Sequence, residues 1–586
     1  MLLLMCGIFS LLNVDYSKFS LDIINESFLK GQNRGPESSV LKNYLNCIFG
    51  FHRLAINGLD NTSNQPIYVD DVLLICNGEI FNYQELYTLI GETPRTNSDC
   101  EIIIHLYKKF GIEYTLELLD GEYAFVLLDC RMTKDNLENY IYIARDPFGI
   151  RPLYYLEPQP QPESQTLFRP PLSDKMLGFA SELKMLIDFN NSTNPCVINQ
   201  FTPGTYSLMK LGGKTNSIWE PVFTNKVFFK HVPASFAKVS HTYIDICNNL
   251  SKYLEHAVIS RCKNTERPVA CLLSGGLDSS TVCAIAHNYF KSINKELETF
   301  SIGLADSEDL KYARKVSTYL GTKHTEIIVD ESEMFTCIKD VIYAIESYDT
   351  TTIRASIGNY LVGKYIKQNS EAKVILNGDG SDELFGGYLY FHNYKNDIEF
   401  DKEIKHLLAN IHYFDVLRSD KCISCHGLEP RTPFLDKNLV NYYLSLPLDI
   451  RNHNNSNKME KQLVRDAVSL MQNNNRQSIL PKDIIYRKKE AFSDGVSSLK
   501  RSLFTIIQEM IIRNDKSYGK YVGVAIEKTY YKCLFDEMFP NSEDTIPYFW
   551  MPKFNQLDDP SARLLSVYSD PLPSTLNDPS FEITEF

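Results

Sequence analysis

The sequence lacks several features that define other classes of protein. No apolar run approaches the roughly eighteen residues of a transmembrane helix. Positive charge is in deficit, since 60 Lys and Arg stand against 73 Asp and Glu, a formal net charge of −13. This balance argues against nonspecific binding to nucleic acid or to an anionic membrane. The fourteen cysteines lack the two close pairs of a zinc site, so we expect the reduced thiols of a cytoplasmic protein.

What remains is the composition of an ordinary globular protein. The hydrophobic fraction is 44% and the charged fraction is 23%, which excludes a largely disordered, collagenous or coiled-coil chain. A chain of 586 residues is longer than one hydrophobic core usually organises. We therefore expect more than one domain.

The pattern of apolar runs divides the chain in two. Short apolar runs separated by turns, such as 72–76 and 124–128, fill the first 210 residues and predict strands with a few helices. Beyond residue 240, strands that end in glycine alternate with helical patterns, which is typical of a parallel doubly wound sheet. We predict an α+β domain of layered antiparallel sheets over 6–225, an α/β domain over 240–569 and a flexible tail over 570–586.

A glycine-rich segment in the second half is the most specific local signal. Ser274-Gly275-Gly276-Leu277-Asp278-Ser279-Ser280 follows a buried apolar run and precedes a helical pattern. Glycines at such a turn let the backbone approach a ligand, and the helix N-terminus offers free N–H groups to phosphate. The Gly-Lys-Ser/Thr ending of a Walker A loop is missing. The structural alternative is a plain strand-to-helix turn with a capping serine.

A second segment concentrates negative charge. Asp379, Asp382 and Glu383 place three carboxylates within five residues, and these repel one another unless a cation or a substrate ammonium joins them. Mg²⁺ prefers carboxylate together with phosphate oxygens, so we predict Asp278 and Asp382 as its ligands. A solvated acidic turn is the alternative.

Further motifs follow one another in a fixed order along the chain. In the first half they are CGIF at 6–9, RGP at 34–36, RLAI at 53–56, NGEIFN at 77–82, SDCE at 98–101 and RDPFGIRPL at 145–153. In the second half, beside 274–280, they are GLEPRTPFLD at 427–436, MEK at 459–461, KEAFSDG at 489–495 and DPSAR at 559–563. The whole set resembles the glutamine-hydrolysing asparagine synthetases. In that family an N-terminal-nucleophile glutaminase domain precedes an ATP-pyrophosphatase (PP-loop) domain.

The resemblance implies a reaction with small-molecule substrates. MgATP adenylates aspartate, giving β-aspartyl-AMP and pyrophosphate, and ammonia from glutamine passes inside the protein to that intermediate to form asparagine and AMP. A homodimer is implied in the same way. Two alternatives stay open, a β-lactam synthetase-like cyclase without glutaminase chemistry and a catalytically silent relative. The intact set of Cys6, Arg53, Asn77 and Asp99 argues against the cyclase.

The resemblance also assigns residues. Cys6 would be the nucleophile, with its own α-amino group as base, and Asn77 with Gly78 would form the oxyanion hole. The implied glutamine contacts are Arg53, Leu54, Ala55, Ile56, Asn57, Asn77, Gly78, Glu79 and Asp99. The implied ATP contacts are Leu273, Ser274, Gly276, Asp278, Ser279, Ile302, Asn377, Gly378 and Lys461. Glu383 and Arg431 would bind aspartate, and Asp379 would take part in forming the adenylate.

The sequence departs from the family pattern in two places. Five residues precede Cys6, whereas the family begins Met-Cys, so we expect initiation at Met5 or trimming of the extension. The family's Ser-Gly-Glu-Gly-Ser-Asp-Glu stands here as 377–383, NGDGSDE. Its glutamate is therefore replaced by Asp379, whose side chain is one methylene shorter.

The first departure predicts the start of the active chain. A free α-amine has a pKa of about 7.7–8 and can act as a base near neutral pH, whereas an amide nitrogen cannot. We expect the intact mass of an active preparation to correspond to a chain that begins at Cys6. Full activity in protein that keeps Met1 quantitatively would rule out the N-terminal-nucleophile mechanism.

Overall fold

The computed structural model describes residues 6–131, 138–159, 176–191, 195–212, 218–233, 242–456, 458–473, 475–497, 501–554, 559–561 and 563. The predicted tail over 570–586 lies outside these residues. All fourteen cysteines are described, and all are free thiols.

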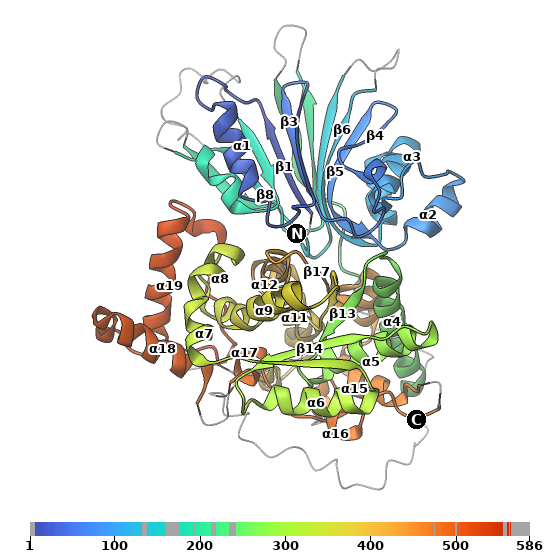
Figure 1. Cartoon of the computed structure of the whole chain (residues 1–586). Coiled ribbons are helices and arrows are strands. Elements are labelled where there is room, and N and C mark those ends of the chain that lie inside the picture. Colours follow the sequence, from blue (N-terminus) through green and yellow to red (C-terminus); the bar gives the residue numbers. More distant parts are fainter. Residues whose placement is uncertain are drawn as a thin grey trace.

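Two antiparallel sheets of six strands form the first half (Figure 1). The first sheet has the order β10-β8-β9-β1-β3-β2 and comprises β1 (Gly7–Leu12), β2 (Ser38–Tyr44), β3 (Cys47–Arg53), β8 (Tyr154–Pro158), β9 (Leu177–Ala180) and β10 (Cys196–Gln200). The second has the order β12-β11-β7-β6-β5-β4 and comprises β4 (Ile67–Val69), β5 (Val72–Ile80), β6 (Gly121–Asp129), β7 (Tyr140–Arg145), β11 (Thr205–Leu211) and β12 (Trp219–Val227).

Alternating apolar side chains explain how these sheets pack. Ile8 and Phe49 of the first sheet share a buried cluster with Ile75 and Val126 of the second, so the two inner faces form a sandwich core. Helix α1 (Leu21–Leu29) packs on the outer face of the first sheet. Helices α2 (Tyr83–Ile90) and α3 (Ile102–Leu118) pack on the outer face of the second. The predicted α+β layering of antiparallel sheets and helices is confirmed.

A five-stranded parallel sheet organises the second half, as predicted. Its order is β15-β14-β13-β16-β17, from β13 (Val269–Leu272), β14 (Glu298–Gly303), β15 (Lys323–Ile328), β16 (Val374–Leu376) and β17 (Glu429–Arg431). The chain adds strands on one side of β13 and then returns to add β16 on the other. This change of direction makes a crevice at the carboxyl ends of β13 and β16, the usual place for a ligand in an open α/β sheet.

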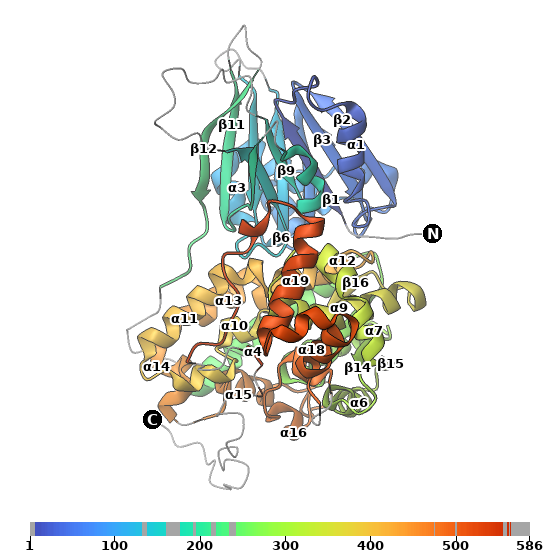
Figure 2. The ribbon, with the colours of Figure 1, turned by 90° about the vertical axis from the view of Figure 1, so that its left-hand side faces the viewer.

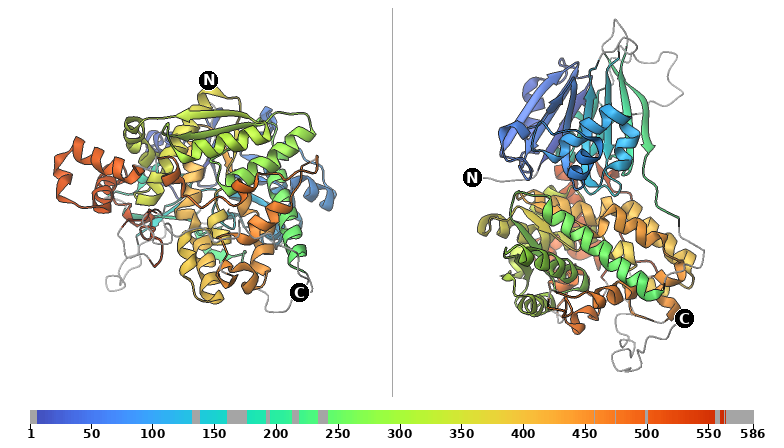
Figure 3. Two further views of the ribbon diagram at one scale, coloured as in Figure 1. Left: turned by 90° about the horizontal axis from the view of Figure 1, so that it is seen from below. Right: turned by 90° about the vertical axis from the view of Figure 1, so that its right-hand side faces the viewer.

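Helices surround this sheet (Figures 1 and 3). They are α4 (Tyr243–Lys263), α5 (Leu277–Ser292), α6 (Glu308–Leu320), α7 (Glu331–Thr336), α8 (Ile338–Ile345), α9 (Thr350–Asn369), α10 (Ser381–Phe385), α11 (Asp397–Asn410), α12 (Asp415–Ser424), α13 (Lys437–Ser445), α14 (Leu448–Arg451), α15 (Gln462–Leu470), α16 (Lys482–Ile485), α17 (Phe492–Gly495), α18 (Leu503–Asn514) and α19 (Val524–Met538). Figure 2 shows α18 and α19 on one side of this half, with α19 rising toward the strands of the first half.

The two halves share both apolar and ionic contacts. Leu54 and Ile56 of the first half belong to the same buried cluster as Leu273 and Leu277 of the second. Helix α12 lies at the junction, near β1 and the N-terminus in Figure 1, and its Asp420 is 1% exposed. The Asp420 carboxylate accepts two arginines from the first half, Arg34 at 2.7 Å and Arg151 at 3.1 Å.

This buried ion cluster makes a prediction about stability. Asp420→Asn removes the charge that two fully buried arginines share, so it should lower the free energy of unfolding by about 3 kcal/mol. Asp483→Asn is the matched control, because Asp483 pairs with Lys315 on the surface and such pairs contribute about 1 kcal/mol or less. Thermal unfolding under identical heating compares the two. Equal shifts would contradict a special role of the buried cluster.

Candidate active sites

The predicted nucleophile lies where the first sheet meets the second half. β1 and β3 are antiparallel with Gly7 opposite His52, which brings Cys6 beside the segment that follows β3. The Cys6 thiol donates to Leu54 O at 3.2 Å, and Leu54 N lies 3.4 Å from Sγ. Arg34 Nε donates to Cys6 O at 3.0 Å. Burial raises the pKa of this thiol well above its ordinary value, so attack requires a base to remove its proton.

The predicted oxyanion-hole residues lie near the end of strand β5 in the second sheet. A Cβ on Gly78 would lie 2.2 Å from Glu122 O on the paired strand β6, so only glycine fits there. Asn77 is 1% exposed, and its Nδ2 lies 3.4 Å from Ser181 Oγ. Ile8 N donates to the same hydroxyl at 3.0 Å, so Ser181 bridges Asn77 to β1 two residues beyond Cys6. Among the described atoms, Asn77 Oδ1 has no hydrogen-bond partner.

The predicted polar contacts to glutamine are held in place by backbone and side-chain partners. Asn57 Nδ2 donates to Glu79 Oε2 at 2.5 Å, and Ile80 N donates to Asp99 Oδ2 at 2.6 Å. Burial raises the pKa of both carboxyls, which therefore gain from a substrate ammonium beside them. Arg53 donates to Asn64 Oδ1 at 2.6 Å and to the carbonyl of residue 58.

Two more of the predicted glutamine residues contribute through their backbone or packing. Ala55 N donates to Glu37 Oε2 at 2.9 Å, and Ile56 is 2% exposed in the cluster shared by the two halves. These residues fix the segment that carries Arg53 and Leu54. The structure thus places Leu54 beside Cys6 and Asn57 beside Glu79.

All nine predicted ATP contacts line one cavity at the carboxyl ends of the parallel strands. They are Leu273, Ser274, Gly276, Asp278, Ser279, Ile302, Asn377, Gly378 and Lys461, and the predicted Asp379 and Asp382 line the same cavity. β13 positions the glycine-rich loop and β16 positions the acidic turn. This is the crevice that the strand order creates.

The glycine-rich loop leaves its backbone available to a ligand. Gly275 has a φ of +73°, and a Cβ there would lie 2.4 Å from the Tyr312 carbonyl carbon, so this position requires glycine. Helix α5 begins after Gly276 without a side-chain cap from the described residues. Ser274 Oγ and Ser279 Oγ lie 3.0 Å apart. Uncapped N–H groups beside two hydroxyls suit phosphate oxygens.

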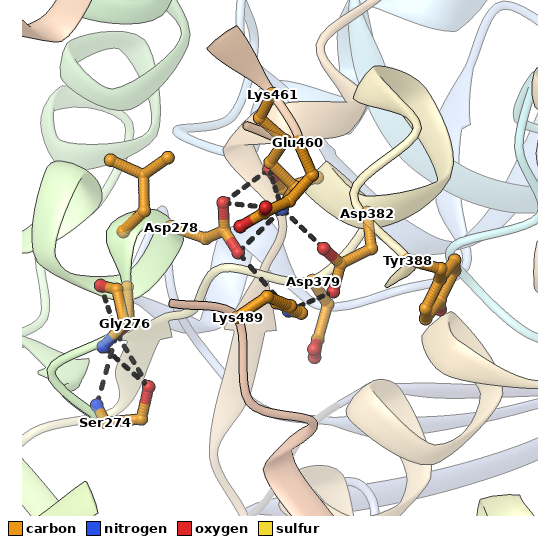
Figure 4. Close-up of polar contacts among 12 residues, drawn as sticks. Ser274, Gly276, Asp278, Asp379, Asp382, Tyr388, Glu460, Lys461 and Lys489 are labelled. Carbon is orange, nitrogen blue, oxygen red and sulfur yellow. Dashed lines mark hydrogen bonds and ion pairs between the residues drawn. The ribbon is translucent and has the colours of Figure 1, made fainter. Parts of the chain in front are cut away.

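Lys461 lies between the two predicted metal ligands (Figure 4). Its Nζ is 2.8 Å from Asp278 Oδ1 and 2.5 Å from Asp382 Oδ1, and Lys489 Nζ is 2.5 Å from Asp382 Oδ2. Burial alone would raise the pKa of Asp382, but the two lysines outweigh it and hold that pKa well below its usual range. The carboxylates of Asp278 and Asp382 therefore converge on the ammonium group of Lys461.

Two residues that line the cavity lie outside every motif in the sequence. Arg418 and Asp415 stand on α12, and Arg418 Nη2 is 3.0 Å from Asp379 Oδ1 and 2.6 Å from Asp415 Oδ1. Sequence reasoning missed both, because no local pattern marks α12. It also missed Tyr388, which follows the acidic turn, and Lys489, although Lys489 lies within a segment that matches the family.

The two residues predicted to bind aspartate do not line this cavity. Glu383 is 3% exposed and accepts a hydrogen bond from Tyr388 Oη at 2.6 Å. Tyr388, rather than Glu383, therefore lines the cavity at this point. Arg431 is fully buried at the junction of the halves, 2.7 Å from Glu429 and 3.4 Å from Glu79. Their positions give no support to direct contact with aspartate.

Two family models and several known proteins match this chain. The glutamine amidotransferase domain model matches residues 5–219, and the asparagine synthase model matches 249–409 and 395–559. The chain thus joins an amidotransferase domain to an asparagine synthase domain. It is 38% identical to the glutamine-hydrolysing asparagine synthetases of Gallus gallus and Mus musculus, over 96% of this chain and 99% of each relative. The chain belongs to the glutamine-hydrolysing asparagine synthetases.

The solved structures that this chain matches resemble it only remotely. A glutamine-dependent NAD+ synthetase from Acinetobacter baumannii is 13% identical, covering 57% of this chain and 48% of that one, with a TM-score of 0.23.

The human asparagine synthetase is 37% identical over 96% of this chain and 99% of the relative. Within the described ranges, none of the helices is long and apolar enough to cross a bilayer.

Proposed function

We propose that the chain makes L-asparagine from L-aspartate, with ATP and with ammonia released from L-glutamine. AMP, pyrophosphate and glutamate are the other products, and β-aspartyl-AMP is the intermediate. The observation that carries the proposal is the presence of two sites in one chain, a buried thiol in the first half and a phosphate cradle in the second. Similarity to synthetases over 96% of the chain supports it, rather than a cyclase or a silent relative.

In the first half, Cys6 attacks the carboxamide carbon of glutamine. The raised pKa keeps the thiol neutral, so the α-amine of a chain that begins at Cys6 takes its proton and returns it to the departing ammonia. Asn77 Nδ2 and Gly78 N–H stabilise the tetrahedral oxygen. Water then hydrolyses the thioester to glutamate. Arg53 binds the α-carboxylate of glutamine, and Asp99 with Glu79 binds its α-ammonium.

In the second half, the β-carboxylate of aspartate attacks the α-phosphorus of ATP and the bond to the bridging oxygen of pyrophosphate breaks. The start of α5 holds the pyrophosphate, while Lys461 and Lys489 stabilise its charge. Asp278 and Asp382 would hold Mg²⁺, since both carboxylates already face the ammonium group of Lys461. No third acidic, His or Cys side chain joins them in the described chain, so phosphate oxygens would complete the coordination. When bound, Mg²⁺ supplies charge neutralisation at the phosphates.

Ammonia then passes from the first site to the acyl-adenylate without leaving the protein. An enclosed route is needed because ammonia in water near pH 7 is mostly ammonium, which is not a nucleophile. The shared apolar cluster supports this part of the proposal, because Leu54, in contact with Cys6, and Leu273, at the second cavity, both belong to it.

We assign 6–225 to an N-terminal-nucleophile glutaminase domain and 240–569 to a PP-loop domain. The strand order and the uncapped glycine-rich loop support the second assignment. Family membership supports a cytoplasmic homodimer.

Two variants separate the sites. Cys6→Ala should abolish glutamine-dependent synthesis and leave synthesis from added ammonium salt, because only the nitrogen source is lost. Asp278→Asn should stop both, through lost metal and pyrophosphate binding. Asparagine and pyrophosphate are measured with each nitrogen donor, and the exposed Cys533→Ala and Asp306→Asn serve as matched controls. Equal losses with both donors in Cys6→Ala would overturn the two-site scheme.

A further pair of variants tests the shortened carboxylate. Asp379→Ala should lose aspartate-dependent pyrophosphate formation and keep glutaminase activity, because only the second cavity changes. Asp379→Glu should retain synthesis within about tenfold, or ~1.4 kcal/mol of barrier, because charge and proton chemistry are kept. Pyrophosphate and glutamate release are measured side by side. Normal pyrophosphate formation in Asp379→Ala would remove this carboxylate from the adenylation step.

A further inference from the structure

A short segment of the second half lies along part of the proposed glutamine site. This clasp segment is 264–267, between α4 and β13, and every residue of 55–58 forms a hydrogen bond with it. The four bonds run from Arg267 Nε to Ala55 O at 2.8 Å, from Glu266 N to Ile56 O at 3.1 Å, from Asn57 Nδ2 to Asn264 Oδ1 at 3.3 Å and from Gly58 N to Glu266 Oε1 at 2.7 Å. The carbonyl of Gly58 in turn accepts from the Arg53 guanidinium, so the clasp segment also supports the side chain of Arg53.

The Arg267 end of the clasp segment fixes the backbone that carries Arg53 and Leu54. Arg267 Nη2 donates to Glu37 Oε1 at 2.9 Å, and the other carboxylate oxygen of Glu37 accepts from Ala55 N at 2.9 Å. Both backbone groups of Ala55 are thus held, the N–H by Glu37 and the carbonyl by Arg267. Glu37 N also donates to Arg53 O at 3.2 Å. This ring of contacts therefore reaches the residue proposed to bind the α-carboxylate of glutamine.

The Asn264 end of the clasp segment holds Glu79, which is proposed to bind the α-ammonium of glutamine. Asn264 Nδ2 donates to Glu79 Oε2 at 3.3 Å, and Asn57 Nδ2 donates to the same oxygen at 2.5 Å. The backbone and side-chain oxygens of Asn264 each lie 3.3 Å from Asn57 Nδ2, so Asn264 orients that amide as well. Asn264 and Glu79 are 6% and 5% exposed, so water does not compete freely for these contacts. Two amides, one from each half, therefore fix the direction of this carboxylate.

We propose that Asn264 and Arg267 are positioning residues for glutamine, so that the second half completes the glutamine site of the first. Arg267 fixes the backbone that presents Arg53, and Asn264 fixes the carboxylate of Glu79. Each acts through a residue that contacts the substrate rather than by touching the substrate itself. This inference rests on the proposed function, whose glutamine site it extends to a second part of the chain.

Glutamine hydrolysis and glutamine binding are measured in the full chain for Asn264→Ala and Arg267→Ala. We expect each variant to raise the KM for glutamine about five- to tenfold with kcat within about threefold, because the substrate contacts are misplaced while the nucleophile is kept. Glutamine affinity, measured by calorimetry in the Cys6→Ala background, should fall by a similar factor. Synthesis from added ammonium salt should stay within about twofold of wild type, because neither residue lines the ATP cavity.

Two matched controls lie away from the clasp segment. Arg314→Ala removes an exposed arginine that pairs with Glu326 inside the second half. Asn369→Ala removes an exposed amide that donates to Tyr365 O within α9. Both controls should leave the KM for glutamine within about twofold of wild type, because contacts of this kind at the surface contribute little. Circular dichroism and synthesis from ammonium salt verify folding in every variant.

Glu37→Ala tests the contact of Arg267 from the first half. The double variant Glu37→Ala/Arg267→Ala should raise the KM for glutamine by less than the product of the two single effects, because the two side chains share one contact. Effects that multiply would show that the two residues act independently, which contradicts a clasp between the halves.

Two further outcomes would overturn the inference. An unchanged KM and affinity for glutamine in either single variant would remove that residue from the glutamine site. An equal loss of synthesis from glutamine and from ammonium salt would assign the effect to folding of the second half. Failure of the proposed function is a different result, because the wild type itself would then hydrolyse no glutamine.

Discussion

The buried charge of Asp420 is the constraint on which the arrangement of the two sites depends. It accepts Arg34 and Arg151 from the first half, and none of the three side chains is more than 1% exposed. Arg34 and Arg151 also pair with Glu182 and Glu122 of the first half, so Asp420 is the carboxylate that joins this buried cluster to the second half. Arg34 also donates to Cys6 O, so the ion cluster that joins the halves fixes the backbone of the nucleophile.

Helix α12 carries this constraint to the second cavity. Ten residues of helix span about 15 Å, and Arg418 and Ser419 on the same helix contact Asp379 and Asn377. Arg431 makes a parallel connection, because its guanidinium faces Glu79 and its carbonyl accepts from Asn377 N. Helix α12 and strand β17 therefore set how the glutamine site and the acidic turn lie relative to each other.

Local motifs made part of the second cavity predictable from the sequence. The loop at 274–280 and the turn at 377–383 each follow a buried strand, so strand order alone brings them to one crevice. Arg418 and Asp415 could not be found in that way, because it is the tertiary packing of α12 that brings both residues to the cavity. Glu383 and Arg431 do not line the cavity, for the converse reason. Each lies in a recognisable segment, but its side chain turns to the interior rather than to the cavity.

The backbone at Lys461 shows how the second cavity maintains its geometry. Lys461 adopts a left-handed conformation, with φ +57°, which costs an ordinary residue about 1–2 kcal/mol. It persists because the ammonium contacts Asp278 and Asp382 and lies 3.1 Å from Ser381 Oγ, while its carbonyl accepts the first hydrogen bonds of α15. Glycine would adopt this turn more readily but would remove the cation that contacts both Asp278 and Asp382, leaving Lys489 alone beside them. Electrostatics therefore outweighs conformational preference here, in keeping with the tendency of strain to collect at functional sites.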